Sequence, residues 1–190
     1  MLLALDTATE FLHLALVRGD GAWTRREGSG PGRTHSQTLL PLLDALLAEA
    51  GATPADLSGV VACVGPGGFT SLRIGVATAE GLGVAGLPTW GFSAFALRAE
   101  ALRQAGHAQA CWILLDGQRG EAFHQRWEGD APTAAAAKRS LGDLPALVGA
   151  EAWWAPEAVA PRMAEALGRP GLALADEGAA TLAGLVALAA

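Results

Sequence analysis

Short apolar runs, separated by turns rich in glycine and proline, follow one another along the chain and predict an α/β fold. Strands are expected at 2–6, 11–18, 22–27, 60–64, 88–90, 111–116 and 121–127. Helices are expected at 34–50, 69–85, 93–104, 144–148, 161–167 and 181–190, with 134–138 either helix or loop. Because tight turns join the first three strands, these should form an antiparallel meander.

The second half of the chain begins like the first, with an apolar strand that ends in an aspartate and a turn. Asp6 ends the first of these strands and Asp116 ends the other. This similarity predicts two related lobes, an N-terminal lobe at 1–105 and a smaller C-terminal lobe at 106–190. If the lobes face one another, both carboxylates approach one cleft.

The two long helices of the first lobe carry more apolar and small residues than one core-facing stripe requires. In the second helix, Gly75, Ala79 and Gly83 recur every four residues and leave one face almost without side chains. A glycine inside a helix costs about 1 kcal/mol relative to alanine, which is tolerated where another backbone approaches closely. Two interpretations stay open: the helices pack on each other within one chain, or they contact a partner, which the additional leucines favour.

The partner interpretation assigns interface residues to both helices. These residues are His35, Leu39, Leu42, Leu43, Leu46, Phe69, Leu72, Arg73, Gly75, Val76, Ala79 and Gly83. His35 begins its helix and is expected to be an interface or capping residue rather than a metal ligand. Arg73 lies one turn into the second helix, where a carboxylate of the partner is preferred over a phosphate as its contact.

Two turns have part of the composition of phosphate-binding loops, but each lacks a feature that such a loop needs. The turn Gly65-Pro66-Gly67-Gly68 could present backbone amides to a phosphate, yet it has no Walker lysine and no dinucleotide spacing. Asp6 and Thr7 could position a metal-bound water or a phosphate, but no glycine lines the turn that follows them. Both turns are therefore expected to be structural, with Asp6 capping its own turn. The weak candidates for nucleotide binding are Asp6, Thr7, Gly67 and Asp116.

The remaining reactive side chains form no recognisable catalytic or metal site. The four histidines are scattered without metal-ligand spacing, and no serine lies in a Gly-x-Ser-x-Gly motif. Cys63 and Cys111 lie in separate apolar strands and are expected to be reduced core residues. No catalytic residue, metal ligand or cofactor is therefore expected in this chain.

Charge and hydropathy narrow the possible partners. The formal net charge is −6 at pH 7, so the chain should repel a phosphate backbone unless it presents a local basic face. Arg25, Arg26 and Arg33 form one small basic patch, which is interpreted either as a solvated edge or as a modest RNA contact. No apolar run reaches the roughly 18 to 20 residues of a membrane helix, and the sequence begins without a basic leader. The expected location is cytoplasmic, with no membrane contact.

Four segments resemble the TsaB family, which is also called YeaZ. They are Leu3–Ala8, Thr34–Pro41, the strand pair within Ile113–Phe123 and, most specifically, the run Val64–Gly75. The likeness is good over about the first half of the chain and fades beyond Gly129. Catalytic relatives of this family carry a His-x-x-x-His metal pair in the first helix region, whereas here His35 is followed by Leu39.

The resemblance implies the two-lobed actin-like fold of the sugar kinase, Hsp70 and actin superfamily (ASKHA), with a mixed five-stranded sheet in the first lobe and a reduced second lobe. It also implies a non-catalytic scaffold that activates the catalytic subunit TsaD, which transfers a threonylcarbamoyl group to the adenosine beside the anticodon of tRNA. The chain would form a homodimer when alone, pair with TsaD through its first two helices, and work with the ATPase TsaE. ATP would be bound mainly by these partners, and tRNA would be contacted only indirectly.

Two alternatives from another class remain open. The first is an actin-like phosphotransferase or nucleotide hydrolase that works through Asp6 and Asp116. The second is a glycoprotease-like peptidase, against which the missing histidine pair argues.

Overall fold

The computed structural model describes residues 1–19, 21–28 and 34–189, and these divide into two compact units. The first unit comprises residues 1–97 together with the C-terminal residues from Thr181 onward, and the second comprises 98–180. The expected lobes, 1–105 and 106–190, differ from these units because the C-terminal segment returns to the first one. Leu185 and Ala189 pack there against Ala4 and Val61 of the first sheet, an apolar contact that the sequence order does not reveal.

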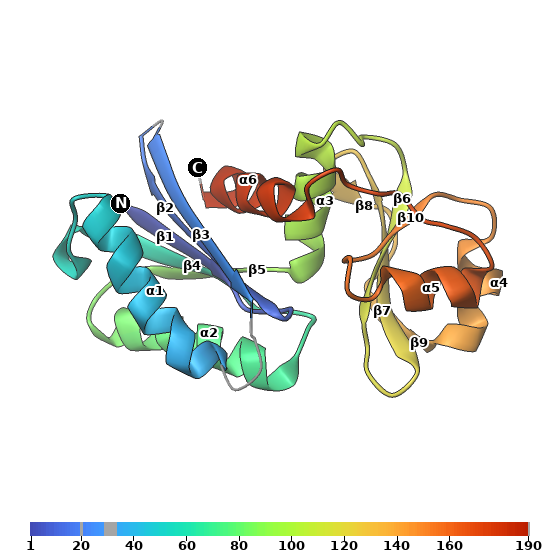
Figure 1. The fold of residues 1–190 in the computed structure, drawn as a ribbon, viewed down its shortest axis with the longest axis horizontal. Coiled ribbons are helices and arrows are strands. Elements are labelled where there is room, and N and C mark those ends of the chain that lie inside the picture. Colours follow the sequence, from blue (N-terminus) through green and yellow to red (C-terminus); the bar gives the residue numbers. More distant parts are fainter. Residues whose placement is uncertain (20, 29–33, 190) are drawn as a thin grey trace. The chain divides into compact units, whose positions relative to one another are not determined.

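The first unit is built on a five-stranded mixed sheet with the strand order β3-β2-β1-β4-β5 (Figure 1). Its strands are β1 (Leu2–Asp6), β2 (Phe11–Arg18), β3 (Gly21–Gly28), β4 (Gly59–Cys63) and β5 (Thr89–Phe92). The first three strands are antiparallel, which confirms the predicted meander, whereas β4 and β5 run parallel to β1. Parallel strands need crossover connections, and helices provide them here.

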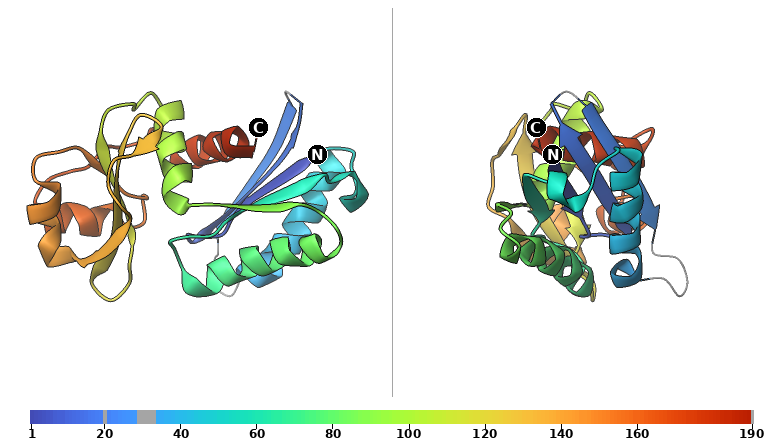
Figure 2. Two further views of the ribbon diagram at one scale, coloured as in Figure 1. Left: turned by 180° about the vertical axis from the view of Figure 1, so that it is seen from behind. Right: turned by 90° about the vertical axis from the view of Figure 1, so that its left-hand side faces the viewer.

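Both faces of this sheet are covered, which explains why its central strands are apolar throughout. The helices of this unit are α1 (His35–Glu49), α2 (Phe69–Val84), α3 (Ala94–Gln104), which continues into the second unit, and α6 (Glu177–Ala189), after the 3-10 turn η1 (Pro54–Asp56). Figures 1 and 2 show α1 and α2 on one face and α6 on the other. Along β1, Leu3 and Leu5 face the core under α1 and α2, while Ala4 faces the core that includes Leu97 and Leu185.

The second unit has a sheet of its own with the order β10-β6-β7-β8, in which β9 also pairs with β7. Its strands are β6 (Cys111–Asp116), β7 (Glu121–Glu128), β8 (Ala131–Pro132), β9 (Ala137–Ser140) and β10 (Trp153–Trp154). The turn η2 (Leu141–Asp143) and the helices α4 (Leu144–Val148) and α5 (Ala160–Leu167) follow or flank them. Trp112, Leu114, Trp153 and Met163 are central to its apolar core.

Most predicted elements are confirmed, and the differences lie in the second unit. The segment 134–138, expected as helix or loop, contributes to strand β9, where backbone pairing with β7 overrides the helix propensity of its alanines. The two-residue strands β8 and β10 were not expected, because runs this short carry no periodic signal. In the part of the chain that the structure describes, no helix is long and apolar enough to cross a membrane.

Candidate functional site

Asp6 ends β1 and is completely enclosed by the protein. One carboxylate oxygen accepts a hydrogen bond of 2.9 Å from the backbone N–H of Ala8, as expected for an aspartate that caps its own turn. The other lies 3.6 Å from Nδ1 of His13, which is also buried. Because none of the Asp6 side chain is exposed, its contacts in this structure are structural ones.

The glycine turn after β4 packs directly on the turn after β1. The N–H of Gly68 donates to the carbonyl of Ala8 at 3.0 Å, so this amide is engaged within the chain. A Cβ on Gly67 would lie 2.4 Å from the same carbonyl oxygen, which explains why only glycine fits there. Thr7 is buried beneath α2. The two turns therefore support each other, and Gly67 serves their close approach.

Asp116 occupies the corresponding position in the second unit and is likewise engaged. It accepts hydrogen bonds from the backbone N–H of Gln118 at 2.9 Å and from Nε2 of Gln118 at 2.7 Å, and it pairs with the guanidinium of Arg162. Each carboxylate thus stabilises a turn of its own unit. Their approach to one common cleft stays a prediction.

The leucines of α1 face mainly the chain's own core. Leu39, Leu43 and Leu46 are buried in the cluster formed with β1 and β2, and Leu42 packs against it from a partly buried position. Their assignment to a partner surface is therefore corrected. Among the leucines of this helix, Leu40 is the one that stays exposed, with 57% of its surface accessible.

His35 is also a residue of the interior rather than of the surface. Its side chain is 4% exposed, and Nε2 lies 3.0 Å from the carbonyl oxygen of Thr9. This contact joins the start of α1 to the turn between β1 and β2. The interface assignment of His35 is therefore corrected, and so is the capping alternative, since Thr34 and not His35 caps α1.

The small face of α2 meets the chain's own sheet instead of a partner. A Cβ on Gly75 would lie 2.5 Å from Oγ1 of Thr7, and Ala79 is buried in the same core. A Cβ on Gly83 would come within 3.1 Å of a methyl group of Thr89 on β5. The glycines are explained by close packing of α2 on the sheet, which corrects their assignment to a partner interface.

The opposite side of α2 remains open to solvent. Leu72 and Val76 are partly buried at its margin. With about 100° of rotation per residue, five of the exposed positions fall within roughly 80° of one another, while the exposed Thr70 and Gly81 lie just beyond them. We call these five the outer stripe of α2, and they are Phe69, Arg73, Ala77, Glu80 and Val84.

The two ends of the outer stripe are apolar and strongly exposed. The exposed fractions are 75% for Phe69 and 91% for Val84, and the guanidinium of Arg73 lies 5.4 Å from the Phe69 ring centre. Phe69 and Arg73 are among the predicted interface residues, whereas Glu80 and Val84 are not. Counting positions in steps of three and four from Phe69 places Glu80 and Val84 on the same side of the helix.

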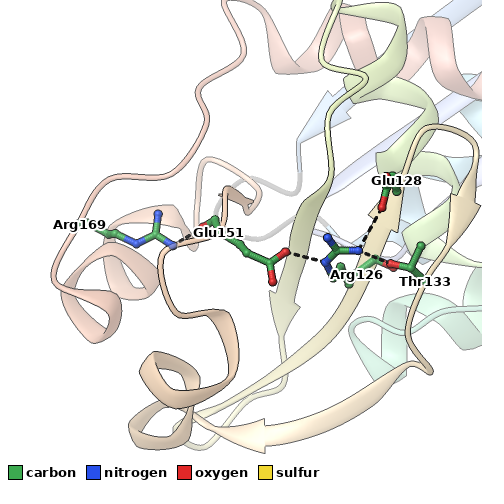
Figure 3. Close-up of polar contacts among 5 residues, drawn as sticks. All are labelled: Arg126, Glu128, Thr133, Glu151 and Arg169. Atoms are coloured by element: carbon green, nitrogen blue, oxygen red, sulfur yellow. Dashed lines mark hydrogen bonds and ion pairs between the residues drawn. The ribbon is translucent and has the colours of Figure 1, made fainter.

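A polar network on the second unit fixes its fold and provides no chemical site (Figure 3). Arg126 donates from Nε to Glu151 at 2.6 Å and from Nη1 to Thr133 at 2.8 Å. Arg169 donates to the backbone carbonyls of Gly149 and Glu151, which stand on either side of Ala150 in the segment before β10. Pairs this exposed contribute little energy individually, so the network mainly sets the position of the segment before β10.

The remaining sequence-based candidates give no reactive centre among the described residues. No group of histidine, cysteine and acidic side chains there could hold a metal ion. Cys63 and Cys111 are buried and form no disulfide within the described part of the chain, and burial raises the pKa of the Cys111 thiol to about 11. Arg25 pairs with Glu49, and Arg26 lies over the ring of Phe11. Arg33, the third residue of the predicted basic patch, lies outside the described residues.

Comparison with known proteins gives a consistent result. The family model described as "TsaD: tRNA N6-adenosine threonylcarbamoyltransferase" matches residues 30–146. The "tRNA threonylcarbamoyladenosine biosynthesis protein TsaB" of Escherichia coli is 32% identical over 68% of this chain and 55% of its own length. The protein of the same name from Haemophilus influenzae is 32% identical over 64% of this chain and 51% of its own length. The chain thus spans about half the length of these curated relatives.

Solved structures extend the likeness to the whole fold. "YeaZ from Pseudomonas aeruginosa" superposes with a TM-score of 0.78 at 27% identity and covers 99% of this chain and 91% of that one. The ethanolamine utilization protein EutJ from Carboxydothermus hydrogenoformans, with a TM-score of 0.53 at 10% identity over 97% of this chain and 88% of its own, shares the fold alone. The fold is therefore actin-like, as the resemblance implied. The chain belongs to the TsaB (YeaZ) family, which lies within the wider family that the threonylcarbamoyltransferase model describes.

Proposed function

We propose that this chain is a non-catalytic subunit in the formation of threonylcarbamoyladenosine in tRNA, and that it activates the catalytic subunit TsaD by binding it through the outer stripe of α2. The observation that carries the proposal is the contrast between the two sides of α2. Its inner side packs against the chain's own sheet, while Phe69 and Val84 are exposed on the other side. Large exposed apolar side chains that gather on one face are typical of protein contacts.

The proposed mechanism is a shift of the partner's conformational equilibrium. Burying one large apolar side chain contributes about 1.5–3 kcal/mol, so two such residues supply enough free energy to favour one conformation of a partner strongly. This chain then needs to bind the competent form of TsaD more tightly than other forms, and it needs no reactive group of its own. The enclosed position of Asp6 and the engaged state of Asp116 support this division of labour.

The outer stripe also has the symmetry that self-association requires. Counted along the sequence, Phe69 and Val84 are equally far from the midpoint between Val76 and Ala77. Arg73 and Glu80 are also equally far from it. A two-fold axis at that point brings the exposed apolar residues of two antiparallel helices together and places each arginine near a glutamate of the other copy. A homodimer of the isolated chain through this stripe is therefore part of the proposal, and TsaD would replace the second copy.

The other partners follow from the same role. The ATPase TsaE joins the complex of this chain with TsaD, and ATP is bound by those two subunits. The proposed location of this work is the cytoplasm. The engagement of Gly68 N–H by Ala8 supports the absence of a nucleotide role for the glycine turn.

Reconstitution of the modification reaction tests the role directly. Purified TsaD, TsaE and unmodified tRNA are supplied with the threonylcarbamoyl donor, with and without this chain. Threonylcarbamoyladenosine should form at least tenfold faster when the chain is present, and the chain should migrate with TsaD in size-exclusion chromatography. An unchanged rate would refute the scaffold role. Tight binding of ATP and magnesium to the isolated chain in calorimetry would instead support the nucleotide hydrolase.

A further inference from the structure

The turn between β6 and β7 holds its backbone in a conformation that its residues disfavour. Gln118 and Arg119 have φ angles of 60° and 50°, and among the described residues no other non-glycine residue has a positive φ. Positions of positive φ in hairpin turns are normally occupied by asparagine or glycine, as Gly120 is here, because other side chains are strained there. Strain that the sequence retains at a particular turn points to a function for that turn.

Asp116 and its partners hold this turn in place. The Asp116 carboxylate accepts two hydrogen bonds from Gln118 and pairs with Arg162 of α5. Gly117 N–H donates to the carbonyl of Glu121 at 3.0 Å, which closes the hairpin. The side chain of Arg119 is exposed at the tip and forms no ion pair among the described residues. The turn is thus a rigid support that presents one cation to solvent.

A second unpaired cation lies on the neighbouring strand. Leu141 N–H donates to the carbonyl of Gly120 at 2.9 Å, so the end of β9 lies beside the turn. Arg139 of β9 is exposed, is opposite Ala122 of β7, and likewise has no ion pair in the described part of the chain.

The neighbouring carboxylates do not balance the positive charge of these two arginines. Glu121 is engaged by Lys138 and Asp116 by Arg162, so neither carboxylate neutralises Arg119 or Arg139. One further exposed carboxylate, Asp143, ends the 3-10 turn that follows β9. The local balance is therefore weakly positive, in contrast to the net charge of −6 for the whole chain.

We propose that Arg119 and Arg139 form a direct, weak contact with the phosphate backbone of tRNA. Guanidinium groups bind phosphate oxygens through several N–H donors, and two of them on adjacent strands can reach neighbouring phosphates. RNA is favoured over an acidic protein because relatives are named for tRNA threonylcarbamoyladenosine biosynthesis. The inference rests on the proposed function for the identity of the RNA, and it adds a direct contact to a role in which tRNA was expected to be touched only indirectly. The contact orients tRNA and contributes no sequence specificity.

Fluorescence anisotropy with labelled unmodified tRNA, at about 50 mM salt and with the isolated chain, tests this contact. Arg119→Gln and Arg139→Gln should each weaken binding by roughly three- to tenfold, and each should reduce the slope of log affinity against log salt by about 1. Arg119→Lys should retain most of the affinity, because it keeps the charge.

Arg103→Gln is the matched control, since Arg103 lies in the same unit but is paired with Glu100. It should leave the affinity for tRNA unchanged. The inference is overturned if no binding is detected at this salt concentration, if Arg103→Gln loses as much affinity as Arg119→Gln, or if Arg119→Gln binds tRNA as tightly as the wild type. Because the measurement contains no TsaD, a chain that binds tRNA through these arginines but never joins TsaD would refute the proposed function and leave this contact standing.

Discussion

Gly75 is explained by the close packing of α2 against residues at the end of β1. Any side chain there would meet the hydroxyl of Thr7 and the methyl group of Leu5, at 2.5 Å and 3.0 Å from the added Cβ. From the sequence, the spacing of Gly75 and Ala79 indicated a close contact on this face of α2, but the expected close approach of another backbone is wrong, because side chains of Leu5 and Thr7 fill the contact. The spacing could not identify the contact, because a helix has the same pattern whether its small face meets its own sheet or a second chain.

Alanine at Gly75 and at Gly81 should have opposite effects on stability. Gly75→Ala overpacks a closed contact, which costs about 1–3 kcal/mol and exceeds the gain of about 1 kcal/mol in helix propensity. Gly81 lies on the same helix with nothing within 4 Å of an added Cβ, so Gly81→Ala should stabilise the protein by up to about 1 kcal/mol. Urea unfolding of both variants measures the difference, and equal midpoints would contradict the packing of α2 described above.

His124 should make the protein less stable in acid. Burial lowers the pKa of His124, with the nearby cation of Arg139 adding to the effect, and neither ring nitrogen has a hydrogen-bond partner among the described residues. The unfolded chain, with a histidine pKa of about 6.5, therefore binds the proton more readily than the folded one. The stability that neutral His124 provides is complete above about pH 6.5 and is lost as the pH falls below that value.

His124→Phe isolates this effect because it keeps a ring against Trp112, which the histidine contacts edge to face at 5.7 Å. The free energy of unfolding, measured by urea titration at pH 7.5 and pH 5.5, should fall less between the two values in the variant than in the wild type. An equal fall in both proteins would show that other groups, such as the Asp6 and His13 pair, carry the acid sensitivity.

At the scale of elements, the long periodic segments could be predicted and the short ones could not. Helices α1 and α2 and the strand pairs β1–β2 and β6–β7 have strong apolar periods and clear turns, which fix their type and approximate bounds. Strands β8, β9 and β10 exist because β7 and β6 offer backbone partners, and no property of their own residues encodes this pairing. The predicted interface residues show the same limit of local patterns. Helical spacing identified residues that share one side of α2, but it could not show which side packs on the chain's own core.

Charge reversal tests self-association through the outer stripe of α2. Arg73→Glu places two glutamates opposite each other in the proposed homodimer, and the double variant Arg73→Glu with Glu80→Arg restores opposite charges. Exposed pairs are worth about 0.2–1 kcal/mol each, so the single variant should dimerise several-fold more weakly and the double variant should recover. Sedimentation velocity over a range of concentrations measures this. If the chain associates through another surface, the single variant will dimerise like the wild type, or the double variant will not regain the dimerisation that the single variant lost.

At the scale of the whole molecule, the fold and family were accessible from the sequence, but the division into units was not. The resemblance to the TsaB family implied the actin-like fold that the chain and its structural relatives have, and the similar starts of the two halves agreed with it. The return of the C-terminal helix to the first unit depends on Leu185 and Ala189 packing against β1, β2 and β4. Such a contact joins residues far apart in sequence, and no local pattern indicates it.

The central claim is that the exposed side of α2, not its glycine face, binds the catalytic subunit. Its most direct test is the affinity of purified TsaD for the wild type, for the double variant Phe69→Ser with Val84→Ser, and for Leu40→Ser, which changes an exposed apolar residue of α1, by titration calorimetry. We expect at least a tenfold loss for the double variant, with its fold intact by circular dichroism, and wild-type affinity for Leu40→Ser. A double variant that binds TsaD as tightly as the wild type would contradict it.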